Sequence, residues 1–194
     1  MDFDDPQLAE WMNKQGLKRN ANEEAMRFAH RVFLHLVRNG KYKDVLTGYE
    51  SRRPSAVCKD MTGCCGGLSL LFVAVMRAND VPARALFGRW AIPQSGKNGQ
   101  YHVVAEFFVE KSGWVPVDVS VTMVHKPKDP NAYFGNADGQ HMAFHVDTDL
   151  EPVKGFRHGW AQYLCPRWIG EGDFWKDHKF ESKWDVNRSP APRE

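Results

Sequence analysis

The segment TGCCGGLSLLFVAVMRANDVPAR, residues 62–84, constrains the fold more than any other part of the chain. Seven apolar residues run without a break from Leu70 to Met76, and the apolar positions from Leu68 onward follow helical spacing. A helix that is apolar almost all round is buried in the centre of a domain. We therefore expect a central buried helix, with two cysteines and two glycines at its start. The run is far shorter than the ~20 residues that a membrane span needs.

The patterns on either side of this segment predict helices before it and strands after it. Apolar residues between Asn22 and Gly40 recur at three- and four-residue steps, which predicts an amphipathic helix capped by Asn22 and stopped by Gly40. Residues 41–61 show no sustained period and are expected to form a loop that walls a cleft. Alternation then predicts strands over ARALFGRWAI, YHVVAEFFV, GWVPVDVSV and MAFHVDTDL, with weaker ones near Tyr163 and Trp184.

Length and charge limit the possible classes of protein. A chain of 194 residues favours one domain, 1–194, which we expect to have a core over about 20–150 and a C-terminal extension, 151–194, packed on that core. Lys and Arg number 26 and Asp and Glu 24, so a net charge of +2 favours neither a nucleic-acid nor a membrane partner. The acidic N-terminus lacks signal-peptide features, so we expect a soluble protein, cytoplasmic or secreted after removal of a signal.

The cysteine pair at the start of the buried segment contains a candidate nucleophile. A thiol at the start of a helix faces unpaired backbone N–H groups and the positive end of the helix dipole, which favours the thiolate. This predicts that Cys65 is activated, and Gly66 and Gly67 would leave room for a substrate backbone. The alternative is that Cys64 and Cys65 are small core residues.

Strand alternation supplies a candidate base and its partner. In YHVVAEFF, His102 lies on the face opposite Val103, Ala105 and Phe107, and in GWVPVDVS the polar Asp118 interrupts a valine-rich strand. If the two strands form a hairpin whose paired residue numbers sum to 222, Asp118 lies within side-chain reach of His102. A sum of 223 would place Asp118 on the opposite face.

Three segments carry these candidates: GCCGGLSLLFVAVMRANDVPAR, YHVVAEFF and GWVPVDVS. Together they resemble the three blocks of the transglutaminase-like superfamily in its microbial members. The resemblance matches Cys65 to the nucleophile, His102 to the base and Asp118 to the residue that orients the base. It implies an α+β papain-like core, with N-terminal helices and a buried central helix packed on an antiparallel sheet. Asp80 replaces a usual glycine, and Val104 stands where a Trp is usual; Trp90, Trp114 or a C-terminal Trp could replace that aromatic.

The resemblance implies acyl transfer on peptide or glutamine carboxamides by a Cys-His-Asp triad without a cofactor. It favours hydrolysis, by a peptidase or amidase. The alternatives are a transglutaminase, which would use a primary amine as acyl acceptor, and a catalytically silent binding module on the same fold. The expected partner is a protein or peptide substrate.

Other polar residues are weaker candidates. The Cys65 N–H is the first donor expected for an oxyanion, and Tyr42 and Tyr49 are candidates for the second. Glu106 shares the His102 face as a supporting carboxylate, although a salt bridge is the alternative for it, as for Arg84 and Arg89.

A second His/Asp pair and a possible metal loop also occur in the sequence. His145 and Asp147 share a strand face, but no nucleophile block precedes them in the expected order. DPNAYFGNAD scatters oxygen ligands without EF-hand spacing, and Cys58, Cys64, Cys65 and Cys165 lack paired CxxC spacing. We therefore predict no metal requirement.

Overall fold

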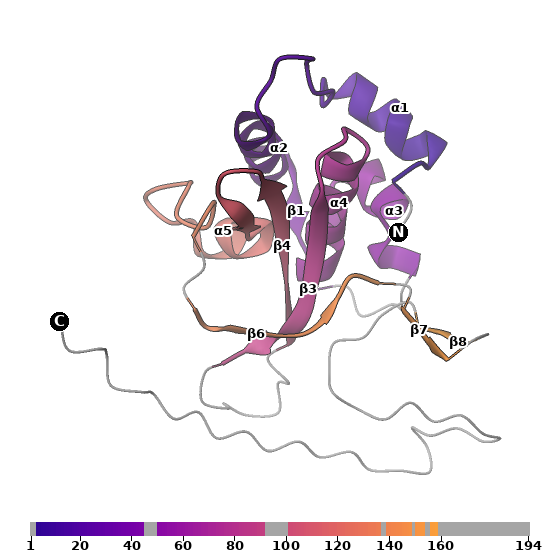
Figure 1. The fold of residues 1–194 in the computed structure, drawn as a ribbon, viewed down its shortest axis with the longest axis vertical. Helices are drawn as coiled ribbons and strands as arrows, with labels where there is room; N and C mark the ends of the chain where they lie inside the picture. The colour runs from indigo at the N-terminus through magenta and orange to yellow at the C-terminus, as the bar shows by residue number, and fades with distance from the viewer. Residues whose placement is uncertain are drawn as a thin grey trace, which may run out of the picture.

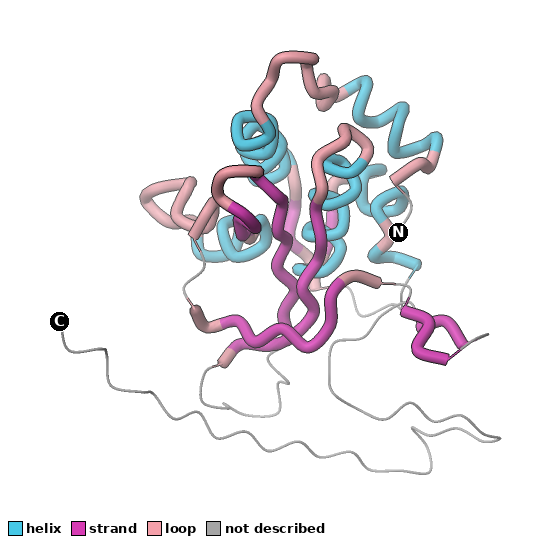
Figure 2. Tube along the Cα trace, viewed as in Figure 1, coloured by secondary structure: helices cyan, strands magenta, loops and turns pink. Residues whose placement is uncertain are grey.

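Helices fill the first part of the chain and strands follow, which confirms the expected α+β class. The computed structural model describes residues 3–44, 50–91, 101–136 and 139–148, and the backbone of 150–153 and 156–158. The elements, shown in Figures 1 and 2, are α1 (Pro6–Lys14), α2 (Ala25–Asn39), β1 (Lys41–Tyr42), the 3₁₀ helix η1 (Glu50–Arg52), α3 (Pro54–Asp60), β2 (Thr62–Gly63), α4 (Cys65–Arg77), β3 (Ala83–Trp90), β4 (Tyr101–Val109), β5 (Gly113–Val117), α5 (Val119–His125), β6 (His141–Val146), β7 (Leu150–Val153) and β8 (Phe156–His158).

Helix α4 is the buried central helix that the apolar run predicts. It begins at Cys65, and every residue from Gly66 to Met76 is buried. One side packs against β3 and β4, where the rings of Phe72 and Phe107 meet edge to face with centroids 6.2 Å apart. The helix therefore holds its first residue in a fixed position relative to the sheet.

The segment 41–61, expected to be a loop, contains several short regular elements. Pro54 occupies the first turn of α3, and Met61, with φ of 57°, ends that helix. Seven residues are too few to show a helical period in the sequence. A Cβ atom added to Gly67 would lie 3.0 Å from Cγ2 of Val57 in α3. Gly67 thus permits close helix packing, which accounts for it without the substrate backbone expected there.

Helix α2 is the expected amphipathic helix, but it begins later than predicted. Its N-cap is Glu24, whose side chain makes no capping hydrogen bond. Before it, Glu23 accepts a hydrogen bond of 2.8 Å from Arg31, which closes the preceding turn against the helix. The expectation that Asn22 is the N-cap is therefore wrong, because the turn ends two residues further along. Gly40 ends the helix as predicted.

The main sheet has the strand order β5-β4-β3-β6 and is antiparallel throughout. Residues 110–112 connect β4 to β5, and Ala105 pairs with Val117, so paired residue numbers sum to 222 as the site hypothesis requires. The expected continuation of β5 beyond Asp118 is wrong, because the chain turns into α5. The Asp118 side chain accepts a 2.9 Å hydrogen bond from the Val121 N–H and caps that helix.

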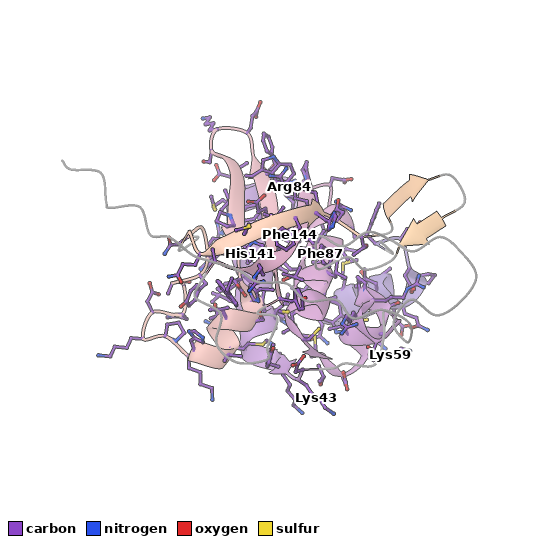
Figure 3. All side chains as sticks on the ribbon, turned by 90° about the horizontal axis from the view of Figure 1, so that it is seen from below. Lys43, Lys59, Arg84, Phe87, His141 and Phe144 are labelled. Carbon is purple, nitrogen blue, oxygen red and sulfur yellow. The ribbon has the colours of Figure 1, made fainter. Side chains whose placement is uncertain are left out.

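Strand β6 confirms the strand expected within MAFHVDTDL. It runs beside β3, with Phe87 opposite His145, and Figure 3 shows His141 and Phe144 along it. The strands expected near Tyr163 and Trp184 lie outside the described residues, as do the side chains of the C-terminal extension. Within the described ranges, no helix is long and apolar enough to cross a membrane.

Candidate active site

His102 and Asp118 form a buried pair at one end of the β4–β5 hairpin. The Nε2 atom of His102 lies 2.5 Å from Oδ2 of Asp118, and the residues are 5% and 6% exposed. The register places them together, because β5 ends one residue before Asp118 while β4 has just begun at His102. With Nε2 engaged by the carboxylate, Nδ1 is the ring nitrogen that remains to exchange a proton with a reacting group.

The carboxylate of Asp118 is stabilised in its ionised form. Burial opposes ionisation, but hydrogen bonds from His102, the Val121 N–H and the Ser120 hydroxyl together outweigh it and lower the pKa of Asp118. Ser120 Oγ donates to Oδ1 at 2.9 Å, so Oδ1 is occupied and Oδ2 faces the imidazole. Asp118 thus holds the ring of His102 and the start of α5 at once.

Two residues from other strands fix the position of His102. The Trp90 ring of β3 stacks on the imidazole with centroids 4.2 Å apart and an interplanar angle of 20°. Of the two described candidates to wall this site, Trp90 therefore lies beside His102, whereas Trp114 is 38% exposed and packs against Phe108. The C-terminal Trp residues lie outside the described residues. His141 Nε2 donates to the His102 carbonyl oxygen at 3.2 Å, a contact that no sequence pattern indicated.

Cys65 is the first residue of α4, where the sequence placed the nucleophile. It is half-buried, and the N–H of Val103 donates a hydrogen bond to its sulfur. Val103 follows His102 directly, so the sulfur lies against the strand that carries the candidate base. The negative charge of Asp118 also raises the pKa of Cys65, so the sulfur lies close to that carboxylate. Helix α4, strand β4 and the residue after β5 therefore meet at one site.

The two cysteines interact with each other, which the sequence did not predict. The Cys65 thiol hydrogen-bonds to Cys64, and together with the Gly67 N–H and Arg52 it lowers the pKa of Cys64 to about 5, against the effect of burial. The same hydrogen bond, then burial, raise the pKa of Cys65 well above its ordinary value. The two thiols therefore titrate as one coupled pair, and the activation of Cys65 by the helix start stays a prediction.

Tyr42 reaches the site through a strand pair that the sequence did not reveal. β1 runs parallel to β2, with Tyr42 opposite Gly63, immediately before the cysteines. Burial, and then the charge of Cys65, raise the pKa of Tyr42 to about 12, so the hydroxyl stays protonated at neutral pH. It can therefore donate a hydrogen bond near the sulfur. Tyr49, the other candidate, lies outside the described residues.

Three of the remaining polar candidates, Glu106, Arg84 and Asp147, are held in structural ion pairs. Glu106 accepts a 2.8 Å hydrogen bond from Arg84, which matches the salt bridge given as the alternative for both residues. Asp147 pairs with Arg77 at 2.6 Å and accepts from the Ala85 N–H, so the proposed second His/Asp pair has its carboxylate engaged elsewhere. The Arg89 side chain is buried, and burial lowers its pKa.

A cavity of about 470 Å³ opens beside the candidate base. Its lining includes Tyr42, Trp90, His102, Ser120 and Tyr133. A cavity of this size, with mostly apolar walls and a few polar groups, is typical of a ligand site. A larger cavity of about 820 Å³ follows α2, and none of the three candidate triad residues lines it. The described residues contain no group of three His, Cys, Asp or Glu side chains that could hold a metal ion.

Residues 12–119 match the family model of the Transglutaminase-like superfamily. The match spans more than half of the chain, and the protein belongs to this superfamily. It includes the cysteine pair, His102 and Asp118. The membership agrees with the resemblance carried by the three sequence blocks. No curated protein matches the sequence.

Three solved structures are distantly similar to this chain. The periplasmic domain of TgpA from Pseudomonas aeruginosa is 16% identical with a TM-score of 0.45, and the match covers 62% of this chain and 43% of that one. A "putative cysteine protease" from Cytophaga hutchinsonii is 16% identical with a TM-score of 0.45, covering 84% and 54%. A "putative protease" from Parabacteroides distasonis is 9% identical with a TM-score of 0.36, covering 61% and 27%. The match spans about half of those chains or less.

Proposed function

We propose that this protein transfers acyl groups from peptide or glutamine carboxamides, with Cys65 as nucleophile, His102 as base and Asp118 as the residue that orients the base. We further propose that water is the main acceptor, which makes the protein a peptidase or amidase. The buried 2.5 Å contact between His102 and Asp118, next to the start of α4, is the observation that carries this proposal. Membership of the superfamily supports it.

The proposed reaction has two half-reactions. Cys65 Sγ bonds to the carbonyl carbon while its proton passes to Nδ1 of His102. When the tetrahedral intermediate collapses, the C–N bond breaks and the leaving amine takes that proton, which leaves a thioester. Water then attacks the thioester with His102 as base, and the thiol is restored with release of the acid. Because the pKa of Cys65 is raised, proton transfer to His102 must accompany the first attack.

The developing oxyanion needs two donors. The Cys65 N–H, at the start of α4, is the first in this proposal. The Tyr42 hydroxyl is the second, because Tyr42 lines the cavity beside His102 and lies opposite Gly63, directly before the cysteines. Glu106 takes no part in this scheme, since a carboxylate cannot donate to an oxyanion and Arg84 already engages it.

A product assay tests the proposal. The full chain and its Cys65→Ser variant are incubated with a glutamine-containing protein, with and without a primary amine, while chain cleavage, ammonia release and amine incorporation are followed. Cleavage or ammonia release that requires Cys65 is the expected result. Amine incorporation without chain cleavage would mean that the protein is a transglutaminase and not a hydrolase. If no product requires Cys65, the protein would instead be a catalytically silent binding module.

Iodoacetamide labelling tests the nucleophile directly. Cys64 and Cys65 share one tryptic peptide, 60–77, so fragmentation of that peptide must assign the label. Cys65 is expected to react faster than Cys58, because Cys65 is half-buried and passes its proton to His102 in the proposed reaction, whereas Cys58 is 2% exposed and has no such base in this proposal. Equal labelling rates at Cys65 and Cys58 would contradict the proposal that Cys65 is the nucleophile.

A further inference from the structure

A second cavity, along α5, adjoins the cavity beside His102. The second cavity has a volume of about 550 Å³, and Tyr42 and Val124 line both. Tyr42 comes from β1 and Val124 from α5, so both elements border both cavities, and the two cavities together are called the groove. A small carboxamide would fill only the inner cavity, and the outer cavity is at least as large.

The groove has mostly apolar walls that solvent can reach. Val124 is 53% exposed and Tyr42 is 41% exposed, although both carry large apolar surfaces. Met123, Pro127 and Pro130 also line the outer cavity. Among the described residues that line the outer cavity, Lys126 alone carries a formal charge. An apolar side chain bound between these walls would remove their surface from water, which is favourable in proportion to the area covered.

We propose that this groove binds an extended polypeptide, with Val124 and Tyr42 selecting an apolar side chain within a few residues of the carboxamide that reacts at Cys65. The inference rests on the proposed function, because His102 lines the inner cavity and sets where the reacting group lies. It adds that the polypeptide substrate carries an apolar side chain close to the reacting carboxamide. A basic residue in the outer cavity is disfavoured by Lys126.

Peptide binding tests the groove without any need for turnover. Two fluorescein-labelled nine-residue peptides, each with a central glutamine flanked by alternating serine and either leucine or aspartate, are titrated into the full-length Cys65→Ser protein. Anisotropy is expected to show at least tenfold tighter binding of the leucine peptide. Val124→Glu, in the same background, should weaken that binding at least tenfold, because the peptide side chain would then desolvate a carboxylate. Val124→Ala should weaken it about threefold through the lost apolar contact.

Val146→Glu is the matched control. Val146 in β6 is 47% exposed and lines neither part of the groove, so this variant should bind the leucine peptide within twofold of the parent. Circular dichroism and thermal melting establish that each variant is folded. Equal affinity for the two peptides, or equal losses in Val124→Glu and Val146→Glu, would overturn the groove proposal. Selective binding by a wild-type chain that forms no product would reject acyl transfer and leave the groove standing.

Discussion

The cysteine pair at the start of α4 and the His102–Asp118 pair both place a negative charge out of water, but they stabilise it differently. Asp118 is a fixed acceptor, because the groups that bond to its oxygens come from His102 and from its own helix α5. Cys64 and Cys65 instead hydrogen-bond to each other, which lowers the pKa of Cys64 and raises the pKa of Cys65. The comparison suggests that the base is oriented in advance, whereas the nucleophile becomes charged only when a proton moves.

The largest expected effect separates the two sulfurs. Cys65→Ser should lower kcat/KM by roughly 10⁴-fold or more, because a hydroxyl is a far weaker nucleophile at this site. Cys64→Ser should lower it less than about tenfold, because Cys64 is buried and does not meet the substrate in the proposed reaction. Steady-state kinetics on a peptide substrate measure both. A larger loss in Cys64→Ser would reverse the assignment of the nucleophile.

The second prediction removes the charge of the fixed acceptor while keeping its shape. Asp118→Asn should lower kcat by roughly 100- to 1,000-fold, because the amide no longer stabilises a protonated His102. Asn caps helices about as well as Asp, so the free energy of unfolding should change little through the cap. Asp118→Ala should lose a further ~1 kcal/mol of stability from α5. Kinetics measure the stabilisation of protonated His102, and urea unfolding measures the capping of α5. Equal activity of Asp118→Asn and wild type would show that the charge of Asp118 does not support His102.

The third prediction concerns stability against pH. The pKa of Cys64 is about 5 in the folded chain and ~8.5 in an unfolded one, so its stabilisation is complete above pH ~8.5 and is lost as the pH falls toward 5. Asp118 has the same sign but acts at lower pH, below the ordinary Asp pKa of ~3.9. Urea unfolding under reducing conditions at pH 5.5, 7 and 8.5 should show this loss in wild type and not in Cys64→Ser. If the free energy of unfolding changes with pH in the same way in wild type and Cys64→Ser, the titrating group is not Cys64.

The smallest expected effect concerns the stack on His102. Aromatic stacking contributes ~0.5–1.5 kcal/mol, so Trp90→Leu should lower kcat by about two- to tenfold, and Trp90→Phe should lose less. The pH profile of kcat/KM is the more informative measurement, because a loosened imidazole should shift the limb that reports His102. An unchanged profile in Trp90→Leu would mean that Trp90 only fills space.

Local patterns predicted most of the framework of the site. The apolar run located α4, strand parity placed His102 opposite the core-facing residues, and loop length limited the hairpin to two registers, one of which brings Asp118 to His102. Each of these follows from a period or a loop length that a few neighbouring residues define. Short elements were missed for the same reason, since α3 and the β1–β2 pair are too brief to show a period.

The side-chain contacts around His102 and Asp118 could not be predicted from local sequence patterns. Asp118 was expected within a strand, but its side chain caps a helix, because a capping hydrogen bond to Val121 competes with a further ladder bond. His141 reaches the His102 carbonyl from a strand 39 residues further along the chain. No local pattern indicates such a contact, because it depends on which strand borders β3.

The sequence by itself therefore determined the order of helices and strands and the position of Cys65 at the start of a buried helix, and it left two hairpin registers, of which the structure has the one that joins His102 to Asp118. These depend on side-chain periodicity and loop length, which are local properties. Only the tertiary structure decided that Trp90 covers His102 and that a hydrogen bond between Cys64 and Cys65 couples their pKa values. Both depend on burial and on groups brought together from distant parts of the chain, and a pKa or a ring stack exists only once those groups have met.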